Sequence, residues 1–261
     1  MSEVLFYERP VPLNRSEHRD LRIRPLPGIG FASKAHSVPL TGVEFVPAAR
    51  DVPILFGGTS KDDAGPMALL GLRQNENLFV GEDNRWVEGA YVPAFVRRYP
   101  FVLAEKPEGA EGDDFTVFLD EAYEGFSKDE GERLFNEDGT DTETLQNAVR
   151  FLGEFQEQVK HTQALMATLR EHDLLEPRSI RVENKNGKGL VLNGLFVVNE
   201  EKLRQLPAEV VHGMMQNGQL GWIFAHLISL ANVDRLIARL NERVPEGDLA
   251  PEGEGEKPTV N

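Results

Sequence analysis

The feature that most constrains the fold is an abrupt change of sequence pattern at Thr140. From Val4 to about Tyr123, proline and glycine recur every few residues, which favours short strands joined by turns over long helices. From Leu145 to Leu169, apolar residues repeat every three or four positions, which is the spacing of an amphipathic helix about eight turns long. The chain is therefore predicted to be an α+β protein, with a Pro-rich antiparallel β region followed by a helical region containing a β-hairpin.

Several segments of the first region carry β-branched or aromatic residues between proline or glycine boundaries and are predicted to be strands. They are Leu21–Arg24, Val43–Val46, Ile54–Phe56, Asn77–Val80, Trp86–Val92, Phe101–Leu103 and Phe115–Leu119. The turn Gly81–Asn84 predicts that the fourth and fifth of them form a hairpin.

The helical region has signals for its own boundaries. Thr140 followed by Glu143 is typical of a capping box, so the long helix is predicted to begin there and to end before Pro177. The dipeptide Asn186-Gly187 favours a two-residue turn and predicts a hairpin over residues 179–198.

Three more helices are predicted after the hairpin. Asn199 is a suitable cap for a short helix over Glu200–Leu206, and further helices are predicted over Pro207–Met215 and Gln219–Arg243. The last of them is expected to bury Phe224 together with its leucines and isoleucines.

These patterns divide the chain into a β-rich region (1–135), a helical region with the hairpin (136–244) and a tail (245–261). The tail holds three prolines, three glycines and four glutamates and is predicted to be disordered and acidic. Residues 104–144 hold 15 Asp or Glu against three basic residues, so part of Lys106–Asp114 and part of Tyr123–Gly131 are predicted to be a mobile loop.

Charge and composition exclude several classes of protein. With 28 Lys and Arg against 43 Asp and Glu, the net charge of −15 repels nucleic acid and anionic membranes. The most apolar run, Gly221–Val233, is shorter than the roughly 20 residues that a membrane span needs. We therefore expect no nucleic-acid partner and no stable membrane insertion, and the absence of a secretion signal favours a cytoplasmic location.

Catalytic and metal-binding signatures are scarce. The chain has no cysteine, and none of its six histidines lies at a helical spacing that suits a metal. Gly28–Ser33 begins like a dinucleotide-binding loop but lacks the last glycine and the preceding strand. The sequence thus predicts no metal and no cofactor, and it identifies no catalytic residue.

The strongest candidate for binding is the run Tyr91–Phe101, in which Arg97 and Arg98 stand among apolar residues, aromatic residues and two prolines. A guanidinium is always charged and binds a carboxylate or phosphate through two parallel hydrogen bonds. In an extended segment the two arginines point to opposite faces. Either both are paired internally with carboxylates such as Glu44, Glu76 or Glu88, or one is free for an anion or a peptide carboxylate.

Other polar clusters add weaker candidates. Asn75 lies in a polar run before a predicted strand, and His18 lies in a polar segment between prolines. The complete set of candidate ligand-binding residues is Arg97, Arg98, Asn75, His18, Tyr99 and Trp86.

The order and spacing of several short motifs resemble the SapC family, bacterial proteins named after a gene associated with surface-layer systems. The motifs are Pro12–Asn14 with His18, Val38–Leu40, Glu44-Phe45, Pro53–Phe56, Leu70–Leu72, Glu76–Val80 with Trp86, Tyr91–Phe101, Leu134-Phe135 with Asp138-Gly139, and Leu174–Pro177. The resemblance implies a role in a surface-layer or envelope-uptake system, and it implies no established set of catalytic residues.

Two functions compete on these grounds. The first is a non-enzymatic accessory or binding protein of a bacterial surface-layer or envelope-uptake system, with a protein or peptide partner and a possible oligomeric state. The alternative is an enzyme or enzyme subunit that holds a small anionic or peptide substrate at Arg97 and Arg98, beside Asn75 and His18.

Overall fold

The computed structural model describes residues 5–26, 28–105, 115–183 and 189–243. The strands are β1 (Pro10–Pro12), β2 (Arg22–Ile23), β3 (Ser37–Pro39), β4 (Ile54–Gly57), β5 (Gly65–Leu69), β6 (Phe101–Glu105), β7 (Phe115–Asp120), β8 (Phe126–Ser127), β9 (Glu132–Arg133), β10 (Leu175–Glu183) and β11 (Gly189–Val198). The helices are the short 3-10 turns η1 (Gly30–Ala32) and η2 (Gly42–Glu44), and α1 (Phe45–Ala48), α2 (Ala94–Arg97), α3 (Glu143–Glu171), α4 (Glu200–Arg204), α5 (Ala208–Gln216), α6 (Gln219–Ser229) and α7 (Asn232–Arg243). Antiparallel sheets followed by a helical region with a hairpin confirm the predicted α+β class.

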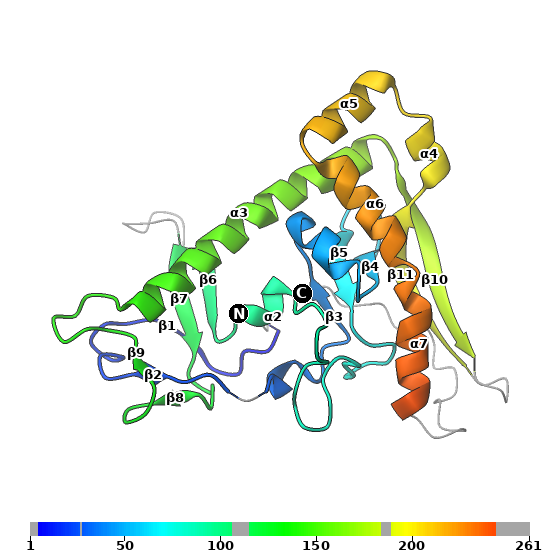
Figure 1. Cartoon of the computed structure of the whole chain (residues 1–261). Coiled ribbons are helices and arrows are strands. Elements are labelled where there is room, and N and C mark those ends of the chain that lie inside the picture. The colour runs from blue at the N-terminus through cyan, green and yellow to red at the C-terminus, as the bar shows by residue number, and fades with distance from the viewer. Residues whose placement is uncertain (1–4, 27, 106–114, 184–188, 244–261) are drawn as a thin grey trace.

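The strands form three antiparallel sheets, in the orders β10-β11-β4-β5-β3, β1-β7-β6 and β8-β2-β9 (Figure 1). The largest sheet combines distant parts of the chain, because Phe56 of β4 lies opposite Phe196 of β11. The predicted hairpin therefore completes a sheet that the Pro-rich region begins. Its expected turn at Asn186-Gly187 lies outside the described residues.

The long helix α3 runs along both parts of the molecule (Figure 1). Thr142 caps it by accepting a hydrogen bond from the Leu145 N–H, two residues after the predicted start at Thr140. Near its N-terminus α3 packs on a small core made of Phe101, Leu119, Leu134, Phe135, Leu145 and Leu152. Farther along, Phe155, Leu165, Met166 and Leu169 belong to the main core. The apolar face that the sequence predicted thus serves two cores.

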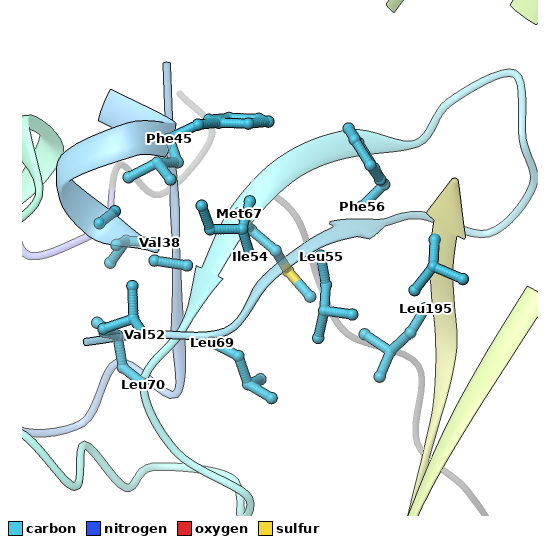
Figure 2. Packing of buried hydrophobic residues seen from close by; sticks show 14 of the residues in the cluster. Val38, Phe45, Val52, Ile54, Leu55, Phe56, Met67, Leu69, Leu70 and Leu195 are labelled. Carbon is cyan, nitrogen blue, oxygen red and sulfur yellow. The ribbon is translucent and has the colours of Figure 1, made fainter. Parts of the chain in front are cut away.

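The main core lies around the five-stranded sheet. Figure 2 shows side chains of β4 and β5 packed with Phe45 of α1 and Leu195 of β11. Ile54 and Phe56 are fully buried, and burial of each such side chain contributes about 1.5–3 kcal/mol. This core gives a rigid support to the loops on either side of it.

The strand predicted over Val43–Val46 is wrong. Val43–Val46 forms part of η2 and α1, because Thr41 and Glu44 make a capping box that turns the chain. The Thr41 N–H and hydroxyl both donate to the Glu44 carboxylate, at 2.9 and 2.8 Å. The T-x-x-E spacing that signals this turn was present in the sequence.

The predicted hairpin around Gly81–Asn84 also differs from the structure. Asn77–Val80 and Trp86–Val92 are not strands and share a single bridge between Val80 and Trp86. Arg243 of α7 donates to the carbonyls of Asn77, Leu78 and Val80, at 3.0, 3.0 and 2.9 Å. A side chain 160 or more residues away satisfies the backbone groups that a partner strand would otherwise satisfy.

The last predicted helix of the C-terminal region differs from the structure. Gln219–Arg243 is two helices, because Asn232 begins α7 and donates to the Ala49 and Val52 carbonyls, at 2.7 and 3.3 Å. The long helix α3 ends at Glu171, before Pro177 as predicted. Pro177 itself lies in the edge strand β10, where the missing N–H of proline is tolerated.

The acidic segments that were predicted to be mobile or disordered lie partly within the described residues. Residues 123–131 contain β8, which pairs with β2, whereas 106–114 and the tail 245–261 lie outside the described residues.

Taken as one helical stretch, Gln219–Arg243 is long and apolar enough to cross a membrane, with a mean hydropathy of 1.2 and 33% of the tested window buried. A core helix of a soluble protein meets the same criteria of length and composition.

Candidate functional site

The candidate site lies where α2 leads into β6. Glu44 is 4% exposed, and its carboxylate accepts hydrogen bonds from the Ala94 N–H at 2.6 Å and from the Tyr91 hydroxyl at 2.9 Å. N–H groups of a first helical turn have no partner within the helix, so Glu44 fixes the start of α2. Burial, assisted by the Glu44 charge, raises the pKa of Tyr91 to about 12, so its hydroxyl remains a donor. The helix is thereby anchored next to the two arginines.

The predicted internal ion pairs of the two arginines are not formed. Within the described part of the chain, no ion pair includes Arg97 or Arg98. Glu44 is occupied by the donors above, and Glu76 pairs with Arg73 at 2.5 Å. The segment is a helical turn and not extended, so the two arginines do not point to opposite faces of a strand.

Arg98 lies between aromatic rings. The carbon at the centre of its guanidinium is 3.9 Å from the centre of the Phe95 ring and 5.3 Å from that of Phe155. Burial lowers the pKa of Arg98 from its ordinary value, whereas a hydrogen bond with Tyr7 acts in the opposite direction. Stacking on aromatic faces offsets part of the cost of burying this charge.

The Nε of Arg98 is buried and has no hydrogen-bond acceptor. Three other buried side-chain atoms of the described residues also lack a hydrogen-bond partner, namely Trp86 Nε1, Gln158 Oε1 and Gln219 Oε1, but only the Arg98 atom belongs to a charged group. An unpaired buried donor on a charged group costs more than one on a neutral group. Arg98 therefore retains hydrogen-bonding capacity that the described protein does not use.

A pocket of about 380 Å³ adjoins both arginines. It is lined by Ile23, Arg24, Pro25, Arg97, Arg98, Tyr99, Pro100, Phe101, Tyr123, Glu132, Thr144, Ala148 and Phe151. The lining carries three arginines and one glutamate in a chain whose net charge is −15, and Arg24 is paired with Glu130 at 3.1 Å. The pocket is a local positive site with partly apolar walls.

Arg97 lies at the same pocket and is exposed. Its Nε donates to the Val92 carbonyl at 3.0 Å, and its guanidinium lies 5.1 Å from the centre of the Phe151 ring. Among the described residues Arg97 forms no ion pair, and a hydrogen bond with Tyr91 occupies part of its guanidinium. The charge of Arg97 therefore has no carboxylate partner at the pocket.

Tyr99 is held by a buried carboxylate. Its hydroxyl donates to Asp120 at 3.1 Å, and burial together with the Asp120 charge raises the pKa of Tyr99. Asp120 is fully buried and also accepts from the N–H groups of Glu8, Arg9 and Ala122, at 2.9 to 3.0 Å. The hydroxyl of Tyr99 therefore has a structural role, although Tyr99 lines the pocket together with Arg98.

The structure brings together three of the six predicted residues and separates the rest. Arg97, Arg98 and Tyr99 line one pocket, whereas Asn75 lines another with Ser33, Arg73 and Arg243. His18 is buried, accepts a hydrogen bond from the Asn14 N–H at 2.9 Å, and lies 4.0 Å from a Glu121 carboxylate oxygen. Trp86 stacks on Phe79 with ring centres 5.5 Å apart.

Sequence reasoning missed the aromatic residues that surround the arginines. Phe155 was assigned to the apolar face of α3, but nothing in its spacing indicated that it covers Arg98. Tyr7 and Phe151 come from segments 91 residues before and 53 residues after Arg98 in the sequence, so only the tertiary fold brings them close. No cluster of three or more potential metal ligands occurs among the described residues.

A family model described as SapC matches residues 13–236 of the chain. No curated protein and no solved structure matches it. The match covers α2, the pocket and most of the C-terminal helices.

Proposed function

Because this chain belongs to the SapC family, we propose that it is a non-enzymatic binding protein of a bacterial surface-layer or envelope-uptake system, which holds an anionic group of its partner at Arg97 and Arg98. The partner in this proposal is a protein or peptide that presents a carboxylate. The supporting observation is that Arg98, which has no carboxylate partner and whose Nε is buried without a hydrogen-bond partner, is one of the residues that line the pocket.

The chemistry of the pocket favours a carboxylate attached to an apolar group. Two guanidinium groups without carboxylate partners offer charge-assisted hydrogen bonds, which are about twice as strong as neutral ones. The remaining walls include Ile23, Phe101 and Phe151, which suit an aliphatic or aromatic body. Hydrated inorganic anions gain less from such walls.

The separation of Asn75 and His18 from the arginines weakens the alternative of an enzyme. That alternative requires the four side chains around one substrate, and the structure places Asn75 at a different pocket and His18 among other partners. A binding role needs only the arginines and the apolar walls.

The test is calorimetric titration of the full chain with N-acetylphenylalanine and with its uncharged amide. We expect saturable binding of the acid and at least about tenfold weaker binding of the amide, because the amide cannot form the charge-assisted pair. The variants R98Q and R97Q should lose this preference. R85Q removes the same charge from an exposed turn and is the matched control.

Equal binding of acid and amide by the wild-type chain would count against the proposal. The same holds for an R98Q variant that folds and keeps the full preference for the acid.

A further inference from the structure

The exposed large apolar side chains of the described residues all lie on neighbouring elements. They are Val43, Val46, Met215, Phe224 and Ile228, between 46% and 69% exposed. They belong to η2, α1, α5 and α6, and both α1 and α5 pack against α6. We call the surface formed by these five residues the α6 patch.

The outer face of α6 is uncharged along its whole length. Gly221, Phe224, Ile228 and the following Ala231 are exposed and recur every three or four residues, which places them on one side of the helix. Residues 205–231 contain one acidic residue, Glu209, and no lysine or arginine, in a chain that is 27% charged. Helix α6 belongs to the stretch Gln219–Arg243, whose composition resembles that of a membrane span. The solvent-facing side of α6 is therefore apolar, as is the side that faces the core.

The elements that carry the α6 patch are closely packed against one another. A side chain at Gly42 would meet the Trp222 ring at 2.4 Å, so η2 lies directly on α6 next to the exposed Val43. A recess of about 290 Å³ opens beside Phe224 and is lined by Leu203, Val211 and Leu220, with the paired Glu200 and Arg204 at its edge. An apolar side chain of a binding partner fits such a recess.

Charge distinguishes between the possible occupants. Residues 199–243 hold five acidic and five basic residues, so the net charge of −15 resides elsewhere in the chain. Two copies of the chain repel each other least when they meet at this neutral surface. A membrane-surface helix normally carries lysine and arginine around its apolar face, and residues 205–231 have neither.

We propose that the α6 patch is the interface between two copies of this chain, arranged about a twofold axis. A twofold interface places the same residues on both sides, and an uncharged apolar surface can face its own copy without like-charge repulsion. Exposed phenylalanine and methionine with few charges match the composition of interface centres. This inference is independent of the anion pocket.

The test is sedimentation velocity of the full chain over a range of concentrations. We expect a two-chain species for the wild type and a single chain for F224D and I228D. The dissociation constant of each variant should be at least about tenfold higher, because each substitution places two like charges in the interface. Both side chains are at least half exposed in the single chain, so the variants should fold. N147D adds the same charge to an exposed position of α3 and should remain two-chain.

A wild-type chain that stays single at its highest soluble concentration overturns the inference. The inference is also overturned if F224D and I228D still form the two-chain species. It is likewise overturned if the wild type binds neutral phosphatidylcholine vesicles and F224D abolishes that binding. Loss of the dimer with intact preference for N-acetylphenylalanine would separate this interface from the anion pocket.

Discussion

His226 and Arg98 are both nitrogen-rich side chains in apolar surroundings, and the protein satisfies one and not the other. His226 is fully buried, its Nδ1 contacts the Ile54 carbonyl at 2.8 Å, and its Nε2 accepts from the Val198 N–H at 3.1 Å. Arg98 lines a pocket, and its buried Nε has no hydrogen-bond partner. Both ring nitrogens of His226 have hydrogen-bond partners and connect α6 to β4 and β11. The Nε of Arg98 has none, so it can still donate a hydrogen bond to a ligand.

The largest effect that tests this contrast is the loss of His226. The substitution H226A leaves the Val198 N–H and the Ile54 carbonyl without partners and opens a cavity. We expect a loss of about 3–5 kcal/mol in the free energy of unfolding, measured by urea denaturation. H212A changes an exposed histidine and should cost less than about 0.5 kcal/mol. Equal costs would remove the distinction between the two histidines.

The second effect is a pH dependence of stability that arises from His226. Burial lowers its pKa from 6.5 to about 4, so between these pH values the unfolded chain binds a proton that the folded chain does not. Its contribution is fully present above pH 6.5 and is lost as the pH falls towards 4, on the order of 3 kcal/mol. Urea denaturation of the wild type and of H226Q at several pH values between 4 and 6.5 measures the contribution of His226 to the free energy of unfolding. Parallel pH profiles for the two chains would contradict the assignment.

The third effect separates support of the site from binding at the site. E44Q replaces a buried carboxylate that accepts from Thr41, Tyr91 and Ala94 with an amide that presents donors to them. We expect a loss of about 2 kcal/mol in stability and weaker binding of N-acetylphenylalanine, because α2 is no longer held in place. E88Q, at an exposed position, is the control. Unchanged stability and binding in E44Q would show that Glu44 does not position the arginines.

The smallest expected effect on stability is the removal of the Arg98 charge. R98Q removes a charge that is costly to bury, and it also removes the stacking of that charge on Phe95 and Phe155. Because these two effects offset each other, R98Q should change the free energy of unfolding by less than about 1 kcal/mol. Thermal unfolding of R98Q beside the wild type measures this. A loss above about 3 kcal/mol would make Arg98 a structural residue like His226.

Sequence reasoning was successful where local signals determine the structure. The spacing of α3, the cap at Asn199 and the hairpin of β10 and β11 were predicted because each depends on neighbouring residues. The strand predicted at Val43–Val46 failed because the capping box at Thr41 outweighs β-branched composition. The break between α6 and α7 depends on bonds from Asn232 to a distant loop, which no local signal reveals.

The candidate site was predictable in part for the same reason. Arg97, Arg98 and Tyr99 are adjacent in the sequence, so their proximity followed from the motif itself. Their grouping with His18 and Asn75 required knowledge of how separate loops are placed, and the structure places these residues elsewhere. The Phe95 and Phe155 rings against Arg98 explain how its charge is buried without a carboxylate.

The most direct test of the central claim observes the Arg98 Nε–H group itself by nuclear magnetic resonance, with its signal identified from R98Q. The account predicts that this signal moves saturably when N-acetylphenylalanine is added and stays in place when the amide is added. A signal that the acid leaves unmoved, while the fold is intact, would contradict the claim that Arg98 keeps its donor for an anionic ligand.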